Sequence, residues 1–233
     1  MLKIISYKIC PFVQRVTAML EAKQMPYQID YISLKDKPDW FLEISPNGQV
    51  PVLITENDTA LFESDAIVEY IDEITPPLHP ALSPEQKAVE RAWSYQASKN
   101  YLVQCSTMRS HDRATLEERA EKLDALFAKA EKQISGEGFF FGPQPGNVDM
   151  AWLPLLHRAD IIQRHAGYDF VKNFPSVKAW QKRLLATGLA EKSVSEDFEE
   201  LFVNFYLSDQ TYLGSGKCCD SPKEDVCKTG ACC

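Results

Sequence analysis

The chain has 233 residues and a formal net charge of −8, and 45% of its residues are hydrophobic. This is the composition of a globular protein with one large domain or two small ones. The acidic balance argues against nucleic acid as a partner, because such binding depends on lysine and arginine neutralising phosphates. No apolar run reaches the roughly 18–20 residues that span a bilayer, so we expect no membrane partner.

The first 75 residues mix strand and helix patterns. Strand patterns, mostly alternating apolar and polar residues, occur at residues 2–6, 27–31, 50–54 and 60–62. Helical patterns, with apolar residues three and four apart, occur at residues 11–25, 38–45 and from Ser64 onward. A helix between two strands predicts parallel pairing of those strands. We therefore expect an α/β domain over residues 1–75.

A proline-rich linker, residues 76–83, separates this domain from a part whose patterns are all helical. Capping-box sequences occur at Ser83–Gln86 and at Thr115–Glu118. This segregation of strands and helices predicts two domains, the second all-helical over residues 84–208. Residues 209–233 offer few core-forming side chains, and we predict a disordered tail there.

Five of the seven cysteines lie in this tail, at Cys218, Cys219, Cys227, Cys232 and Cys233. Soft thiolate ligands could bind zinc or copper(I), although their spacing is not that of a zinc finger. A redox tail, a lipid-modified end and an unstructured extension are the alternatives. We therefore assign no metal site, and treat these five residues as candidates only.

Cys10 is the candidate reactive residue. It follows a strand pattern and precedes a helical one, and Pro11 suits the first helical position. Cys10 would then be the N-cap, where free amides and the helix dipole stabilise a thiolate, so we expect ionisation near neutrality. Val13 stands where a Cys-x-x-Cys motif has its second thiol, so another thiol has to resolve any disulfide on Cys10. The alternative is a buried structural cysteine.

Four segments carry a resemblance to a known family: Cys10-Pro11-Phe12-Val13-Gln14-Arg15, Leu34-Lys35-Asp36-Lys37-Pro38-Asp39-Trp40-Phe41, Asn47-Gly48-Gln49-Val50-Pro51-Val52-Leu53 and Glu63-Ser64. Together, and in this order, they resemble segments of the cytosolic glutathione transferases, and among these the Cys-type omega class. The resemblance implies a thioredoxin-like N-terminal domain, an all-helical C-terminal domain, a homodimer, and glutathione as co-substrate in an N-terminal cleft.

The resemblance also implies roles for individual residues. Cys10 would form a mixed disulfide with glutathione. Glutathione would be bound by Phe12, by Lys37 at its glycyl carboxylate, by the backbone of Val50 before a cis Pro51, and by Glu63 and Ser64 at its γ-glutamyl end. These groups suit a ligand with two carboxylates and an ammonium. The alternatives are simple helix capping for Glu63 and Ser64 and a solvated surface charge for Lys37.

These features predict glutathione-dependent thiol transfer to glutathionylated or small oxidised substrates such as dehydroascorbate. The alternatives are conjugation of an electrophile with Tyr7 as activator, and a binding module without turnover. The substrate pocket is expected between the domains, with Tyr101 and Arg109 as candidates, while Cys105 is expected to be an inert helical residue. The N-terminus lacks a signal-peptide pattern, so we expect a cytoplasmic protein with reduced cysteines.

Overall fold

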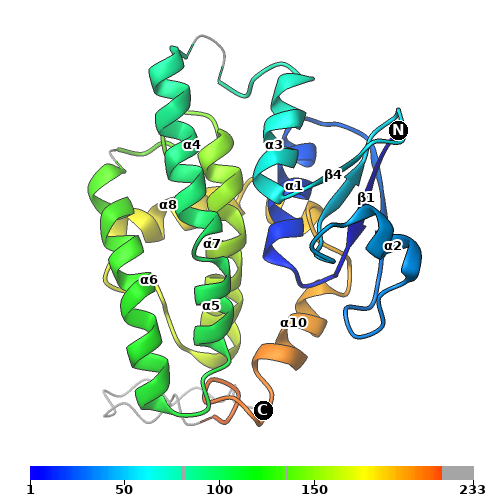
Figure 1. Ribbon diagram of the computed structural model, residues 1–233. Coiled ribbons are helices and arrows are strands. Elements are labelled where there is room, and N and C mark those ends of the chain that lie inside the picture. Colours follow the sequence, from blue (N-terminus) through cyan, green and yellow to red (C-terminus); the bar gives the residue numbers. More distant parts are fainter. Residues whose placement is uncertain (80–81, 135, 217–233) are drawn as a thin grey trace.

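The computed structural model of the protein describes residues 1–79, 82–134 and 136–216. A sheet with its flanking helices forms one half of the molecule, and a group of longer helices forms the other (Figure 1). None of the helices in the described ranges combines the length and apolar character needed to cross a bilayer.

The N-terminal half is built on a four-stranded sheet with the order β2-β1-β3-β4. Its strands are β1 (Leu2–Ser6), β2 (Tyr27–Tyr31), β3 (Val52–Ile54) and β4 (Ala60–Phe62). Its helices are α1 (Pro11–Ala22), α2 (Asp39–Ile44) and α3 (Ser64–Glu73). The β1–β2 pair is parallel, as predicted, and the β1–β3 and β3–β4 pairs are antiparallel. The apolar residues of β1, α1 and α3 meet in one core.

Two of these elements are shorter than the sequence suggested. Helix α1 ends at Ala22 because Gln24 has a positive φ of 54°, and the N–H of Met25 then bonds back to the carbonyl of Leu20. Strand β3 begins only after Pro51, which has no N–H to offer the sheet. The peptide bond between Val50 and Pro51 is cis, as we expected.

The second half contains only helices among its described residues. They are α4 (Pro84–Ser98), α5 (Tyr101–Met108), α6 (Arg113–Gln133), α7 (Asn147–Ala166), α8 (Pro175–Leu185), α9 (Leu189–Lys192) and α10 (Phe198–Tyr206). The predicted combination of an α/β N-terminal part and an all-helical C-terminal part is therefore confirmed. The capping box at Ser83 is also present, with Gln86 as its second member. The box at Thr115 was a wrong prediction, because the carboxylate of Asp112 already caps α6 one turn earlier.

Helix α7 runs through the centre of the helical half, and its start is fixed by a buried carboxylate. Asp149 accepts hydrogen bonds from the N–H groups of Gly146 (2.8 Å) and Phe140 (3.1 Å) and from the indole of Trp180 (2.6 Å). A Cβ atom at position 146 would lie 2.2 Å from the ring of His79. This close approach explains why glycine stands where a serine or threonine cap would ordinarily be found.

The two halves are joined by polar contacts as well as by apolar packing. The side-chain amide nitrogen Nε2 of Gln14 lies 2.9 Å from Nδ1 of His157, and the hydroxyl of Thr17 donates to the carbonyl of Ser193 (2.6 Å). On the surface, Lys8 forms an ion pair with Asp197. These contacts tie the start of α1 to α7 and to the segment before α10, so that groups from both halves surround Cys10.

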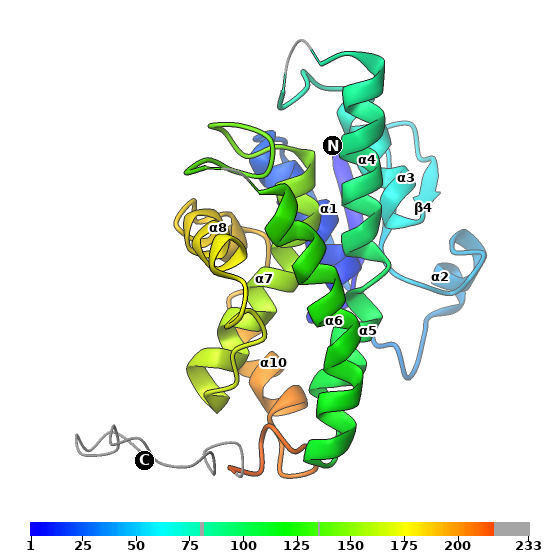
Figure 2. The ribbon, with the colours of Figure 1, turned by 90° about the vertical axis from the view of Figure 1, so that its left-hand side faces the viewer.

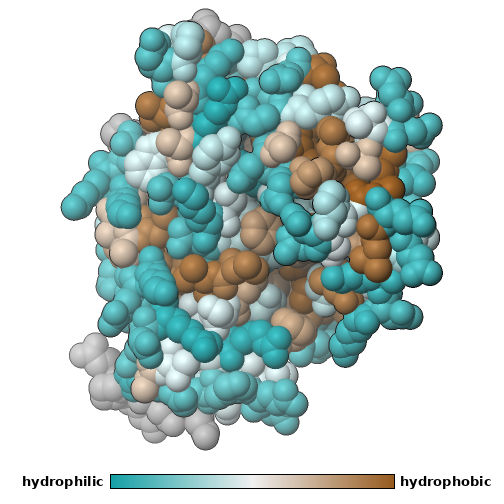
Figure 3. Space-filling model, viewed as in Figure 1, coloured by the Kyte–Doolittle hydropathy of each residue, from teal (hydrophilic) through white to brown (hydrophobic). Residues whose placement is uncertain are grey.

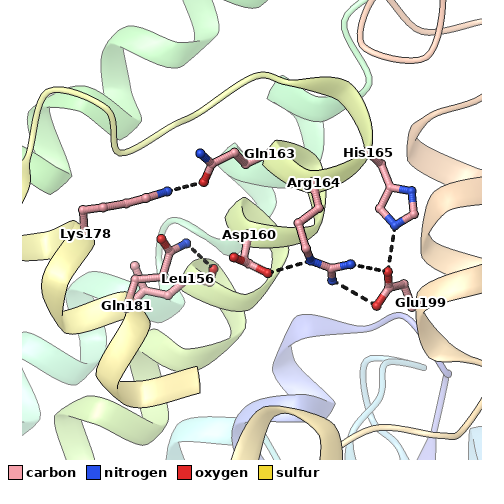
Figure 4. A network of polar contacts seen from close by, with 8 residues as sticks. All are labelled: Leu156, Asp160, Gln163, Arg164, His165, Lys178, Gln181 and Glu199. Carbon is pink, nitrogen blue, oxygen red and sulfur yellow. Dashed lines mark hydrogen bonds and ion pairs between the residues drawn. The ribbon is translucent and has the colours of Figure 1, made fainter. Parts of the chain in front are cut away.

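A second polar network joins α7 to α10 and α8 (Figure 4). The guanidinium of Arg164 lies between Asp160 (2.9 Å) and Glu199 (2.6 Å), and His165 also contacts Glu199 (2.7 Å). This network holds α10 against α7 and thereby places the aromatic face of α10 near the reactive cysteine.

The segment after α10 packs against the helical half as far as the structure describes it. Thr211 and Leu213 are buried, and the N–H of Tyr212 donates to the carbonyl of Ser110 (2.8 Å). Figure 2 shows this segment beside the junction of α5 and α6. The predicted disordered tail from residue 209 is therefore wrong for residues 209–216. Residues 217–233, with all five clustered cysteines, lie outside the described residues.

Candidate functional site

Cys10 stands at the junction of β1 and α1. It is the N-cap of α1, and Pro11 takes the first helical position, as predicted. Its own N–H donates to the carbonyl of Tyr7 (3.0 Å), which fixes the turn out of the strand. The sulfur accepts no cap hydrogen bond, but the N–H groups of Phe12 and Val13 lie close enough to it to lower the pKa of the thiol. The sequence therefore builds an amide-lined thiol at the start of a helix.

The protonation of this thiol differs from our expectation. The N–H groups of Val13 and Phe12 and the charge of Arg158 all favour the thiolate. Burial opposes them more strongly and raises the pKa of Cys10 to about 11. In the ligand-free protein the thiol form therefore predominates near neutrality, which corrects the prediction that Cys10 is ionised there.

The six predicted glutathione-binding residues line one cleft. The cleft has a volume of about 300 Å³, and Cys10 lies on its wall together with Phe12, Lys37, Val50, Pro51, Glu63 and Ser64. These residues come from four separate segments of the chain, which the sheet brings together. Figure 3 shows apolar residues gathered over the N-terminal half of the molecule and in a band across the middle of the face.

Glu63 has the most unusual backbone in the cleft. It is the N-cap of α3 and has φ 65° and ψ 114°, a conformation that non-glycine residues rarely adopt. Its carboxylate accepts a hydrogen bond from the side-chain amide of Asn47 (3.2 Å), across the cleft rim. Ser64 follows at the first position of the helix and is buried. Backbone strain of this kind is often found at ligand sites.

The turn before Pro51 shapes the other wall of the cleft. Gly48 has φ +57°, and a Cβ atom there would lie 3.3 Å from the side chain of Leu42 and 3.6 Å from Nζ of Lys37. The turn therefore places the ammonium of Lys37 beside exposed backbone. Asn47, Gln49 and other lining residues were not singled out from the sequence, although the Asn-Gly turn signal marked this position.

A second, more apolar pocket adjoins the cleft and shares Cys10, Phe12 and Leu102 with it. It is lined by Tyr7, Ile9, Cys10, Pro11, Phe12, Leu102, Cys105, Ser106, Arg109, Phe205 and Tyr206. The guanidinium of Arg109 lies 4.7 Å from the ring centre of Phe205, an arrangement typical of a cation–π contact. The structure thus places Arg109, a predicted pocket residue, at this site. Tyr7 also faces this pocket and is not among the residues that line the cleft.

The prediction that Tyr101 lines the substrate pocket is not supported by its position. Its side chain is fully buried, and its hydroxyl donates to the carbonyl of Ala151. Its ring lies edge-to-face against Phe12, with 5.1 Å between ring centres. Tyr101 therefore fixes the start of α5 against α1 and does not present a surface to a ligand.

Sequence reasoning missed Arg158, the residue of α7 that lies behind Cys10. It is fully buried and donates to the carbonyls of Ile9 (3.2 Å) and Pro154 (3.1 Å) and to the side-chain oxygen of Gln14. A single arginine in a largely apolar helix pattern gives little indication that its side chain is buried behind Cys10.

Within the described residues no cluster of three or more candidate metal ligands is found, and the tail cysteines lie outside that range.

A sheet of this topology with a cysteine at the start of its first helix, followed by an all-helical domain, defines a glutathione transferase architecture. The chain belongs to the glutathione S-transferase family: the family's N-terminal domain matches residues 9–74 and its C-terminal domain matches residues 113–183.

Individual relatives agree with this assignment. Pyrimidodiazepine synthase of Drosophila melanogaster is 33% identical over 78% of this chain and 76% of its own length. Glutathione S-transferase omega-1 of Mus musculus is 29% identical over 89% of this chain and 87% of its own length. The crystal structure of glutathione transferase Omega 3C from Trametes versicolor superposes with a TM-score of 0.72 at 25% identity, covering 84% of this chain and 89% of that chain. The chain is thus an omega-like member of the family.

Proposed function

We propose that the protein is a glutathione-dependent thiol transferase that acts through a mixed disulfide between Cys10 and glutathione. The observation that carries this proposal is the position of Cys10, which lies on the wall of both the cleft and the apolar pocket. One sulfur can therefore meet glutathione on one side and an acceptor on the other. Two solved glutathione transferases of the same fold contain bound glutathione.

The chemistry is an exchange of disulfide partners. The Cys10 thiolate attacks the glutathione sulfur of a glutathionylated substrate, and the substrate leaves as a thiol. A second glutathione then attacks the enzyme-bound glutathione, restores the Cys10 thiol and leaves as oxidised glutathione. The N–H groups of Phe12 and Val13 stabilise the thiolate in each half of the cycle. Dehydroascorbate is a further acceptor implied by the resemblance, because its reduction uses the same thiol.

The cleft offers one cation and one carboxylate that suit the charged ends of glutathione. Lys37 is the cation near the turn at Gly48, and the Glu63 carboxylate lies at the start of α3. A glycyl carboxylate at Lys37 and a γ-glutamyl ammonium at Glu63 would bring the cysteinyl unit to the backbone of Val50, near Cys10. This arrangement pairs each ligand charge with an opposite charge.

Turnover of the mixed disulfide of glutathione and cysteine tests the proposal. The wild type is expected to release cysteine and consume reduced glutathione, and Cys10→Ser is expected to lose this activity while retaining the fold. Glutathione binding without turnover in the wild type would support the binding module. Conjugation of an aromatic electrophile that survives in Cys10→Ser and disappears in Tyr7→Phe would support the conjugating alternative.

Three further properties follow only from the proposed function and the resemblance. A reaction that consumes reduced glutathione suits a reducing compartment such as the cytoplasm. The resemblance implies a homodimer, which sedimentation at micromolar concentration would detect. The proposed domain limits, residues 1–75 and 84–208, would be tested by limited proteolysis in the intervening linker.

A further inference from the structure

A second thiol lines the apolar pocket together with Cys10. Cys105 lies on α5 and is half-buried, and both sulfurs are free. Helix α5 is held against the start of α1 by the edge-to-face contact between Phe12 and Tyr101, whose ring centres are 5.1 Å apart. Tyr101 and Cys105 are one helical turn apart and share a face of α5. The contact that fixes Tyr101 beside Phe12 therefore also brings Cys105 towards Cys10.

A single buried cation serves both thiols. Arg158 interacts electrostatically with Cys10 and with Cys105. Its hydrogen bonds go to neutral oxygens, those of Gln14, Ile9 and Pro154, and its Nε has no hydrogen-bond partner. In the part of the chain that the structure describes, no carboxylate forms an ion pair with it. A thiolate on either cysteine would supply the missing negative charge.

Tyr206 adds a donor to the second thiol. Its side chain lines the same pocket as Cys105, and burial together with the nearby sulfur raises the pKa of the Tyr206 hydroxyl. The hydroxyl therefore keeps its proton and donates it towards sulfur. Cys105 also lies close enough to be among the groups that raise the pKa of Cys10. The donor and both thiols thus line one pocket, and the buried charge of Arg158 acts on both thiols from α7.

We propose that Cys105 is a resolving thiol for Cys10 and forms a reversible disulfide with it across this pocket. The proposal rests on the proposed function, because it begins from the mixed disulfide of Cys10 with glutathione. It assigns a redox role to a residue that the sequence pattern presented as inert. Cys105 of α5 would then do what the second cysteine of a Cys-x-x-Cys motif does, at whose position this chain has Val13.

The step exchanges one disulfide for another. The Cys105 sulfur, having lost its proton, attacks the sulfur of Cys10. The bond between Cys10 and glutathione breaks, and glutathione leaves with the electron pair and takes up a proton. Both enzyme thiols are then oxidised and the bound glutathione is reduced. Two molecules of reduced glutathione restore the dithiol and leave as oxidised glutathione. A disulfide requires the Cα atoms of Cys10 and Cys105 to lie within about 7 Å of each other, so α5 and the start of α1 must be able to reach that separation.

Three full-length variants test the proposal, each with the five tail cysteines replaced by serine. The first keeps Cys10 and Cys105, the second also carries Cys105→Ser, and the third also carries Cys10→Ser. Each is reduced, exposed to oxidised glutathione, quenched with acid and alkylated in denaturant. Intact mass then counts adducts and free thiols, and peptide mapping locates the disulfide. Serine keeps a hydroxyl beside Tyr206, and equal melting temperatures of the three variants show that the fold is intact.

The expected results separate the two thiols. The Cys105→Ser variant accumulates a stable adduct of one glutathione on Cys10. The variant with both thiols instead ends mainly as a species without glutathione, lighter by two hydrogens and closed to alkylation at both cysteines. The Cys10→Ser variant gains no adduct and its Cys105 is alkylated.

Two other results would overturn the proposal in different ways. A stable glutathione adduct on Cys10 with an alkylated Cys105, in the variant that keeps both, would remove the resolving role and leave the proposed function intact. No adduct on Cys10 in either variant that retains it, and no internal disulfide, would remove both.

Discussion

The guanidinium of Arg158 donates to the carbonyl of Ile9, the residue that precedes Cys10 (3.2 Å). A charge on the central helix of the C-terminal half is thus bonded to the loop that carries the reactive thiol of the N-terminal half. The same charge lowers the pKa of Cys10. Arg158 is therefore a positioning residue whose influence on the thiol is both geometric and electrostatic.

Removing the charge of Arg158 should make Cys10 less reactive. In Arg158→Met the pKa of Cys10 is expected to rise further, and alkylation by iodoacetamide at pH 8 should slow several-fold, whereas Arg158→Lys should retain part of the rate. Lys129→Gln removes an exposed cation of α6 that lines neither the cleft nor the apolar pocket, and this control should react like the wild type. Circular dichroism shows whether each variant folds. Equal alkylation rates in Arg158→Met and wild type would remove Arg158 from the site.

The pH dependence of alkylation follows from the high pKa of Cys10. Only the thiolate reacts, and a pKa of about 11 means that its fraction grows about tenfold per pH unit up to about pH 10. The rate in a variant that keeps Cys10 as its sole cysteine should therefore rise throughout this range without a plateau. A plateau already reached at pH 7 would show that the helix N-terminus and Arg158 outweigh burial.

Glutathione affinity should depend on Lys37. The ammonium lines the cleft beside the Gly48 turn, where it can pair with a carboxylate of the ligand. Because the pair is partly exposed, we expect Lys37→Ala to weaken binding by about fivefold, which corresponds to roughly 1 kcal/mol. Lys35→Ala removes an exposed lysine two residues away that does not line the cleft, and is the matched control. Calorimetric titration with glutathione measures both, and equal affinities would assign Lys37 to the solvated surface.

The buried carboxylate of Asp149 should be among the largest single contributors to the stability of the helical half. It accepts three hydrogen bonds, and Asp149→Ala leaves all three donors without partners at about 1–3 kcal/mol each before relaxation. We expect a loss of several kcal/mol in the free energy of unfolding, measured in urea. Asp149→Asn should lose less, because its side-chain oxygen still accepts. A loss below about 1 kcal/mol in Asp149→Ala would show that water replaces the carboxylate.

The network around Glu199 makes a pH-dependent contribution to stability. Hydrogen bonds from Arg164 and His165 lower the pKa of Glu199 to about 2 from its ordinary 4.5. The stabilisation is therefore complete above about pH 4.5 and is lost as the pH falls towards 2. Because the side chain is 45% exposed, we expect no more than about 1 kcal/mol. Unfolding of wild type and Glu199→Gln should show the full difference at pH 7 and a clearly smaller one at pH 3, where part of the stabilisation is already lost, and a constant difference would contradict the prediction.

Much of the fold could be predicted because local patterns agreed with it. The strand-Cys-Pro-helix order placed Cys10 at the N-cap of α1, and Ser83 with Gln86 marked the start of α4. The four family-like segments gave the residues that line the cleft. These features depend on neighbouring residues, since caps, turns and alternating side chains are set by backbone geometry over a few positions.

The sequence by itself determined where the thiol stands and which four segments contribute to the cleft beside it. Only the tertiary structure decided how strongly that thiol is buried, which cation lies behind it, and that Cys105 shares its pocket while Tyr101 does not. Desolvation and charge act through space, and Cys10, Cys105 and Arg158 are far apart in the chain. Their effects on one another arise only when α1, α5 and α7 pack together.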